Sequence, residues 1–309
     1  MPRRLSTRRA QPSALRRCRS LGFGWLALCF LLTPGPGTIS AEPASSAKDQ
    51  RSPAPPARIY VDFHAKTWFP RGFLFTDIEA MIRNKVQAAG LSLTRDRSEP
   101  HDYVLAVAYR EEPGREYRVQ NYGTVIHCEL RLTDRQQTSL FDVAFEESSD
   151  YVESGTPPYL EALEKFQANP YFYFLGDLLK GRIVAGLNVQ DALVEGLRRS
   201  VTHPPKSEDP LDAHNMQSFD EFHFLWAWEN AVKELARLKA PRAIPVMISM
   251  LGHRDPKVRV MAVTGLETIG VKEAVQPIEE IARHDPAADV CARAETALRL
   301  LSRPVSPGP

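Results

Sequence analysis

The sequence predicts an α+β protein: an N-terminal β-α-β-β-β domain with covering helices, followed by a short α-solenoid of helix pairs. Three patterns carry this prediction. Apolar and polar residues alternate in the first half, as in strands, and apolar residues recur at helical spacing in the second half. There a motif also repeats about every 31 residues, which indicates stacked repeats. A composition of 43% hydrophobic and 25% charged residues excludes a polytopic membrane protein.

Residues 1–41 have the organisation of a secretory signal peptide. A basic segment without acidic residues precedes an apolar run at 21–32 and a small-residue stretch that ends at Ala41. The run is shorter than the roughly 20 residues of a membrane-spanning helix, although an uncleaved signal anchor stays an alternative. We expect export to the periplasm or beyond, and no transmembrane span in the mature chain.

The four cysteines predict neither a disulfide framework nor a metal site. Cys29 follows a segment that resembles a bacterial lipobox, but Leu28 stands where that motif needs a small residue, so a lipid anchor at Cys29 is the less favoured alternative. Cys128 and Cys291 form no Cys-x-x-Cys motif, and we expect two free thiols rather than a bridge. The sequence identifies no cofactor.

The formal charge of +1 is unevenly distributed along the chain. Residues 1–41 hold seven Arg and no acidic residue, so the remainder has 32 basic against 38 acidic residues and a net charge of −6. A mildly acidic protein without a basic stripe disfavours nucleic acid and anionic lipid. We therefore expect a protein partner.

The N-terminal domain is expected at 58–201, after a flexible linker at 42–57 that is rich in Pro, Ala and Ser. Alternation at 59–63 predicts a strand. Thr76 and Glu79 predict a capping box that opens a helix, and Gly90 suits the left-handed residue after its end. The apolar run at 103–109 then predicts a central strand buried on both faces.

Two further strands and a helical segment complete this domain. Pro113-Gly114 predicts a type II turn and a hairpin. Alternation at 126–132 and at 141–145, on either side of a polar turn, predicts the strands. Residues 157–201 lack such alternation, and we expect helices that cover the exposed face of the sheet.

The C-terminal part is expected to hold about two and a half helical repeats at 218–303, between a linker at 202–217 and a disordered tail at 304–309. Ser218 and Glu221 form a second predicted capping box, for a helix that ends near Leu238. The matching positions recur at 31- or 32-residue spacing: Ala231, Ala262 and Ala294; Leu235, Leu266 and Leu298; Leu238, Ile269 and Leu301. Asp255-Pro256 and Asp285-Pro286 each suit a helix start, because Asp can cap and Pro fits the first turn.

These positions resemble the HEAT-like repeats first described in phycobilisome lyases. Asp255-Pro256 with Ala262 and Leu266 is a close match, and the second copy is looser, with Cys291 where Arg is usual. The resemblance implies an α-solenoid that binds other proteins or docks on its own neighbouring domain, and it does not imply lyase activity. The element order of the first domain also resembles small α/β domains of bacterial envelope proteins, such as the lipopolysaccharide-assembly lipoprotein and the N-terminal domain of the Tol-system periplasmic protein.

The first repeat helix carries more aromatic side chains than one amphipathic stripe needs. We expect burial on both sides, against the repeats and against the α+β domain; an exposed partner site is the alternative. The aromatic and neighbouring apolar positions are Phe219, Phe222, Phe224, Leu225, Trp226 and Trp228.

No pattern of catalytic residues is present, and we predict a non-catalytic protein with two candidate binding surfaces. The first is an aromatic loop that contains Trp68 and Phe69, for which packing over the core is the favoured alternative. The second is the polar side of the inner repeat helices, whose alternative is a simple solvated face. Its members are Arg242, Ser249, Lys272, Glu279, Glu280 and Arg283.

The predicted function is that of an exported binding or assembly scaffold of the bacterial cell envelope, which contacts a protein through the repeats. Two alternatives stay open. One is an enzyme whose site lies in the cleft between the domains. The other is a carrier of envelope lipid or glycan, which would need an apolar cavity under the helices of 157–201.

Overall fold

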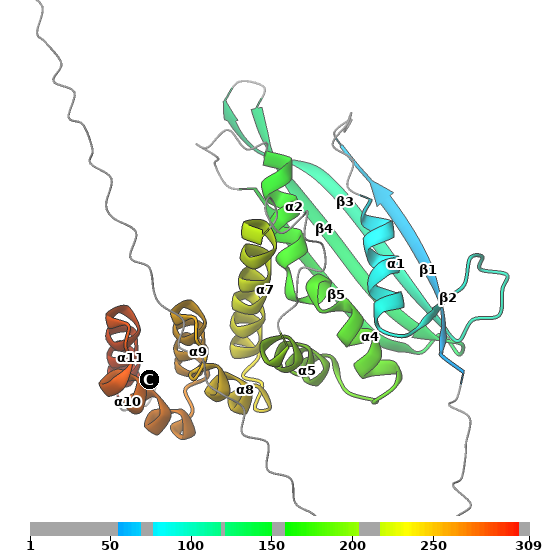
Figure 1. The fold of residues 1–309 in the computed structure, drawn as a ribbon. Helices are drawn as coiled ribbons and strands as arrows, with labels where there is room; N and C mark the ends of the chain where they lie inside the picture. The colour runs from blue at the N-terminus through cyan, green and yellow to red at the C-terminus, as the bar shows by residue number, and fades with distance from the viewer. Residues whose placement is uncertain (1–54, 69–76, 119–120, 150–157, 204–216, 303–309) are drawn as a thin grey trace, which may run out of the picture. The chain divides into compact units, whose positions relative to one another are not determined.

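The computed structural model describes residues 55–68, 77–118, 121–149, 158–203 and 217–302. The expected signal peptide, most of the 42–57 linker, Phe69, Thr76 and the C-terminal tail lie outside these ranges. One mixed sheet of five strands, in the order β2-β1-β3-β4-β5, forms the first part of the fold (Figure 1). The strands are β1 (Arg58–Lys66), β2 (Ser92–Leu93), β3 (Tyr103–Arg118), β4 (Asn121–Asp134) and β5 (Ser139–Ser148).

The predicted β-α-β-β-β order is confirmed, with the two-residue β2 added at the sheet edge. β1 runs parallel to β2 and β3, whereas β3, β4 and β5 are antiparallel neighbours. Register aligns Val61, Leu105, Leu132 and Phe141 across four strands, and all four side chains are buried. This row forms the middle of the core face of the sheet.

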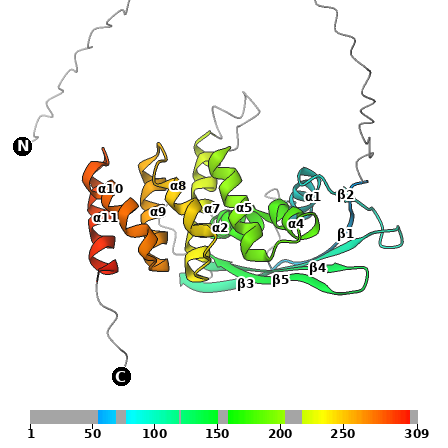
Figure 2. The same ribbon diagram turned by 90° about the horizontal axis from the view of Figure 1, so that it is seen from below.

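In the described part of the chain, the helices that pack on the sheet all lie on this one face. Figure 2 shows the helices on one side and the strands on the other, and the core beneath them joins Ile82, Phe166, Phe172 and Leu179 to the strands. The expectation that residues 157–201 cover the opposite face is therefore wrong. The helices are α1 (Ile78–Ala88), α2 (Pro158–Ala168), α3 (Pro170–Tyr173) and α4 (Leu175–Ile183).

The two-sided burial expected for 103–109 is also wrong. Leu105, Val107 and Tyr109 are buried, whereas Ala108 and Arg110 on the opposite face are exposed. Alanine makes the run look continuously apolar in the sequence, but its small side chain gains little from burial. A strand with alternating small or polar positions can leave that face open to solvent.

The predicted hairpin is present as the antiparallel pair β3 and β4, but Pro113 and Gly114 lie within β3, so the predicted position of the turn is wrong. The register between β3 and β4 shifts between Pro113 and Glu116, which marks an irregularity in the ladder. Proline has no N–H to donate and is tolerated at such points. Gly114 fits because a Cβ there would lie 3.1 Å from the carbonyl carbon of Gly123.

Local capping explains the ends of α1 and of β4. The Asp77 side chain accepts a hydrogen bond from the Ala80 N–H at 2.9 Å and caps α1, the role that the sequence assigned to Thr76. Gly90 has a φ of 80°, which confirms its left-handed conformation. The predicted polar turn is confirmed as well, because Asp134 Oδ1 accepts from the Thr138 N–H at 2.8 Å.

The second part of the fold consists of helices that pair in sequence order, which confirms the predicted repeats. Ala231, Ala262 and Ala294 are fully buried at equivalent positions, so the helices approach closely there. After α5 (Val189–Thr202), the helices are α7 (Gln217–Arg237), α8 (Ala243–Met250), α9 (Pro256–Ile269), the 3₁₀ helix η1 (Lys272–Ala274), α10 (Val275–His284) and α11 (Ala288–Leu301).

Helix α7 contacts both parts of the fold, as predicted, although the side chains of Phe219 and Phe222 lie outside the described part of the chain. It packs on α2, α3 and α5 and also on α8 and α9. The buried Trp228 indole donates to Ser200 Oγ at 2.8 Å, and the Tyr171 hydroxyl donates to Glu234 Oε1 at 2.6 Å. One apolar cluster therefore extends from α5 through α7 to α11.

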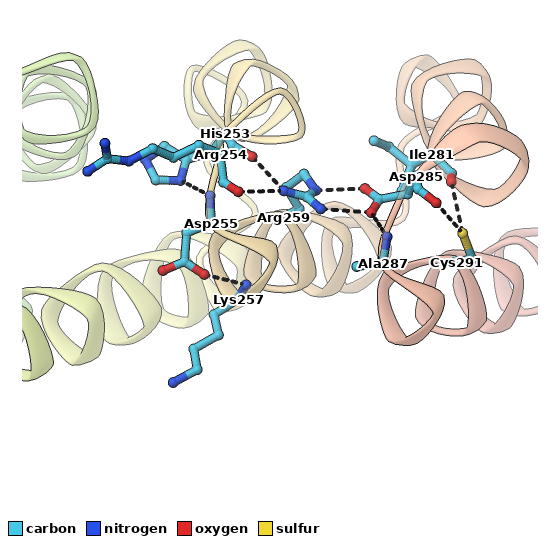
Figure 3. A network of polar contacts seen from close by, with 9 residues as sticks. All are labelled: His253, Arg254, Asp255, Lys257, Arg259, Ile281, Asp285, Ala287 and Cys291. Atoms are coloured by element: carbon cyan, nitrogen blue, oxygen red, sulfur yellow. Dashed lines mark hydrogen bonds and ion pairs between the residues drawn. The ribbon is translucent and has the colours of Figure 1, made fainter. Parts of the chain in front are cut away.

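Only the first of the two Asp-Pro pairs starts a helix. Asp255 caps α9 by accepting from the Lys257 N–H at 2.8 Å, as predicted. The second prediction is wrong, because α11 begins at Ala288 with Ala287 as its N-cap. Asp285 instead accepts two hydrogen bonds from the Arg259 guanidinium, at 2.6 and 2.7 Å, which links consecutive repeats (Figure 3).

Arg259 also binds the loop before its own helix. Its Nη1 donates to the carbonyl oxygens of His253 and Arg254 at 2.8 and 3.0 Å (Figure 3). Cys291 has the equivalent place on α11, with its Sγ 3.2 Å from the Asp285 carbonyl oxygen. Both Cys128 and Cys291 are free thiols, as predicted.

Candidate binding surface

The residues expected on the inner repeat helices do not form one site. Arg242, just before α8, pairs with Asp191 of α5 at 2.9 Å. Ser249 satisfies its hydroxyl locally by donating to the Val246 carbonyl oxygen at 2.6 Å. Lys272 is exposed in η1.

The remaining predicted residues lie on α10. Arg283 pairs with Glu279 one turn earlier at 2.8 Å, and Glu280 lies 3.7 Å from His284. Glu280 and Arg283 are exposed, so these pairs fit a solvated helix surface that is open to contact. Trp68 lies just beyond β1 in the sheet part and is partly buried; Phe69 falls outside the described ranges.

A groove of about 540 Å³ brings Arg242 together with residues from α4 and α5. Gly181 of α4 lines the groove and packs closely on α5: a Cβ there would lie 2.7 Å from the Ala192 Cβ, which favours glycine. We call it the α4–α5–α8 groove. Its lining residues are Asp177, Lys180, Gly181, Val184, Ala185, Leu187, Asp191, Val194, Glu195, Arg198, Arg199, Arg242, Pro245 and Val246.

The groove combines apolar side chains with three ion pairs. Besides Arg242–Asp191, Arg199 pairs with Asp177 at 2.7 Å, and Arg198 Nε donates to Glu195 at 2.9 Å. Burial raises the pKa of Asp177 above its ordinary value, against the opposing effect of Arg199 and Lys180. The Arg198 hydrogen bond lowers the pKa of Glu195.

A second, smaller groove of about 320 Å³ lies along α7 and α9. Val232, Val260 and Met261 contribute apolar surface to it. Lys233 on its rim pairs with Glu229 at 2.6 Å. This rim holds both signs of charge in equal number, with Lys233 and Lys257 against Glu229 and Asp289.

The open face of the sheet is polar. His127 lies between two carboxylates, 3.5 Å from Glu112 and 3.1 Å from Glu146, and Arg131 pairs with Asp142 at 2.7 Å. Within the described ranges, no group of three or more His, Cys, Asp and Glu side chains is placed to hold a metal ion. The ion pairs of His127 and Arg131 are typical of a sheet face that is open to solvent.

Sequence reasoning missed most of the α4–α5–α8 groove. It identified Arg242 but not Lys180, Val184 or Arg199, because the helical segment at 157–201 was expected on the other face of the sheet. One signal was available: Arg198-Arg199 stands at the end of a predicted helix that lies before a linker. The side-chain pairing across helices has no signature in a single sequence.

A model of the HEAT repeat family matches residues 229–299, from within α7 to within α11. The C-terminal part of the chain is thus a HEAT-like repeat region. No curated protein and no solved structure matches the chain. Across the described residues, the helices are too short or too polar to cross a bilayer.

Proposed function

We propose that this protein is an exported, non-catalytic scaffold of the bacterial cell envelope, which binds a protein partner through its HEAT-like repeats. The repeats carry this proposal, because HEAT-like helix pairs commonly serve as protein contact surfaces. The basic, apolar and small-residue order of residues 1–41 supports export.

The contact of α7 with both parts supports a scaffold role. Tyr171, Ser200 and the Ala168 carbonyl oxygen all hydrogen bond to α7 side chains, so the repeats are held on the sheet part. A partner that binds the repeats is thereby held at a fixed place relative to the sheet. The exposed side chains of Lys272, Glu280 and Arg283 offer polar contacts on that repeat surface.

The carrier alternative has less support than the scaffold. A lipid or glycan carrier would need an apolar cavity between the sheet and the helices of 158–203. Phe166, Phe172, Leu175 and Leu179 from those helices are fully buried against the sheet and fill that space. The two grooves described above lie on the helices instead.

Site-specific photo-crosslinking in intact cells tests the scaffold. We would place benzoylphenylalanine at Lys272 and Arg283, with Glu295 on the exposed side of α11 as the matched control. The proposal expects one identified protein adduct from the envelope fraction at Lys272 or Arg283 and none at Glu295. Equal labelling at all three positions, or no adduct, would overturn it.

Cell fractionation tests the location separately. An exported chain should be recovered from the envelope or periplasm and should start near residue 42 after cleavage. Recovery of the chain from the cytoplasm with residues 1–41 intact would contradict export.

A further inference from the structure

We propose that the α4–α5–α8 groove binds an acidic segment of a partner protein, in which carboxylates alternate with aliphatic side chains. This inference rests on the proposed scaffold function and names the chemistry of the partner. Charge, exposed apolar surface and groove size each support it.

The charges of the groove favour a negatively charged ligand. Four cationic side chains line it against three carboxylates. Each carboxylate already has an arginine partner: Asp177 with Arg199, Asp191 with Arg242 and Glu195 with Arg198. Lys180 is exposed and makes no ion pair within the described ranges.

The three arginines retain capacity to donate. Their side chains are 55% (Arg198), 56% (Arg199) and 64% (Arg242) exposed. A guanidinium has five N–H donors, and one carboxylate uses at most two of them. An incoming carboxylate can therefore share an arginine with its present partner and also neutralise Lys180.

Exposed apolar surface at the same place indicates that the ligand is not purely ionic. Val184, which lines the groove, is 68% exposed, the highest value of any large hydrophobic side chain in the described part of the chain. Leu187, Val194 and Val246 continue the apolar lining. Aliphatic side chains of a ligand would remove this surface from water.

The carboxylates of the groove argue against a uniform polyanion. A nucleic acid would bring phosphates past Asp177, Asp191 and Glu195 as well as past the cations, and like charges would repel. A peptide can place its carboxylates at Lys180 and the arginines and its aliphatic groups at Val184. The volume of about 540 Å³ lies within the range for ligand pockets and suits a few residues.

Fluorescence anisotropy with labelled octapeptides tests this assignment on the full chain. The probe alternates Glu and Val, and two comparison peptides replace Glu by Gln or by Lys. We expect the Glu peptide to bind at least about tenfold more tightly than the Gln peptide, with an affinity that falls as salt rises.

Three variants locate the binding. Lys180→Glu should lower the affinity for the Glu peptide by at least about tenfold and raise the affinity for the Lys peptide. Val184→Ser should lower the affinity for both the Glu peptide and the Gln peptide. Lys257→Glu, an exposed lysine at the other groove, is the matched control and should leave binding unchanged. Circular dichroism confirms that each variant is folded.

The following results would contradict the assignment of the groove. Equal binding of the Glu and Gln peptides, or equal weakening by Lys180→Glu and Lys257→Glu, overturns the assignment. Val184-dependent dimerisation without peptide binding also overturns it, because the occupant is then a second copy of the chain. If the peptide does not bind while the Lys272 crosslink persists, only the assignment of the groove is contradicted. If the peptide binds and no crosslinked adduct forms, the proposed binding surface on the repeats is contradicted.

Discussion

At the scale of single residues, the Arg259–Asp285 pair is a buried ion pair between consecutive repeats. The two side chains are 9% and 1% exposed, and two hydrogen bonds join them. Removing one member leaves the other charge buried without compensation. Arg259→Ala should therefore lower the free energy of unfolding by about 3–5 kcal/mol, measured by urea denaturation.

Two comparisons make that prediction specific. Arg283→Ala breaks an exposed ion pair and should lower the free energy of unfolding by less than about 1 kcal/mol. The Arg259 hydrogen bonds also lower the pKa of Asp285, so this pair stabilises the fold above the unfolded-state pKa, and the contribution is lost as the pH falls. An Arg259→Ala variant as stable as the wild type would show that the pair contributes nothing.

Lys85 gives a second prediction at this scale. Its Nζ donates to the Tyr173 carbonyl oxygen at 3.1 Å and lies 5.0 Å from the Phe172 ring centroid. Burial lowers its pKa from 10.5 to about 8, although Asp177 opposes the shift. Between these two values the unfolded chain binds the proton and the folded chain does not, so this group makes stability rise with pH.

Lys85→Met removes that contribution. The difference in unfolding free energy between wild type and Lys85→Met should change between pH 7 and pH 10, in favour of the wild type at the higher pH. The exposed lysine variant Lys257→Met should follow the wild type throughout. A constant difference between Lys85→Met and wild type over this range would refute the buried-lysine interpretation.

At the scale of elements, helix α7 joins the two parts of the fold, and its Trp228 is a fully buried side chain that hydrogen bonds to Ser200 of α5. Trp228→Ala should lower the free energy of unfolding by about 3–5 kcal/mol, because it removes a fully buried ring and leaves a cavity. Hydrogen exchange should accelerate in both α5 and α9. Glu229→Ala, which removes only a surface pair, is the control; faster exchange confined to α7 would show that the two parts are not coupled through it.

The contact of α9 with α7 and α8 depends on Gly265. A Cβ there would lie 2.5 Å from Val232 Cγ1 and 2.9 Å from Met247 Sδ, both inside normal contact distance. Gly265→Ala should therefore destabilise the protein by about 1–3 kcal/mol, measured by thermal or urea unfolding. Gly252→Ala meets only the Ser249 carbonyl oxygen at 3.6 Å and should be tolerated.

The sequence was sufficient for elements whose signals are local. Alternation identified β1, β4 and β5, the apolar run at 103–109 identified β3, and the spacing of Ala231, Ala262 and Ala294 identified the repeats. It failed where the outcome depends on distant partners. Pro113-Gly114 looks like a turn until β4 pairs beside it, and Asp285 looks like a cap until Arg259 reaches it from another helix.

The candidate site shows the same division. The polar residues of α10 could be placed on a helix surface from periodicity alone. The α4–α5–α8 groove could not, because it depends on which helices cross and on which face of the sheet they cover. Only Arg242 was identified in advance, and its partner Asp191 lies 51 residues earlier in the chain.

At the scale of the whole molecule, the described residues from 55 to 302 belong to one compact unit. Because α7 shares its core with both parts, we expect a single cooperative unfolding transition, with coincident tryptophan fluorescence and far-ultraviolet circular dichroism curves. A fragment of residues 217–302 should lose this cooperativity, since Trp228 would lose Ser200 and α5. Two separate transitions in the full chain would contradict this picture.

The repeat position that holds Arg259 on α9 holds Cys291 on α11, and this difference has a consequence for protein engineering. Arg259 spans the gap to the next repeat, whereas Cys291 contacts carbonyl oxygens of residues that precede α11. A copy appended after α11 would meet Cys291 instead of an arginine at the position that makes this link. A longer array would therefore have to grow by duplication within the stack, with the Arg259-bearing unit as the template and the Cys291-bearing helix kept last.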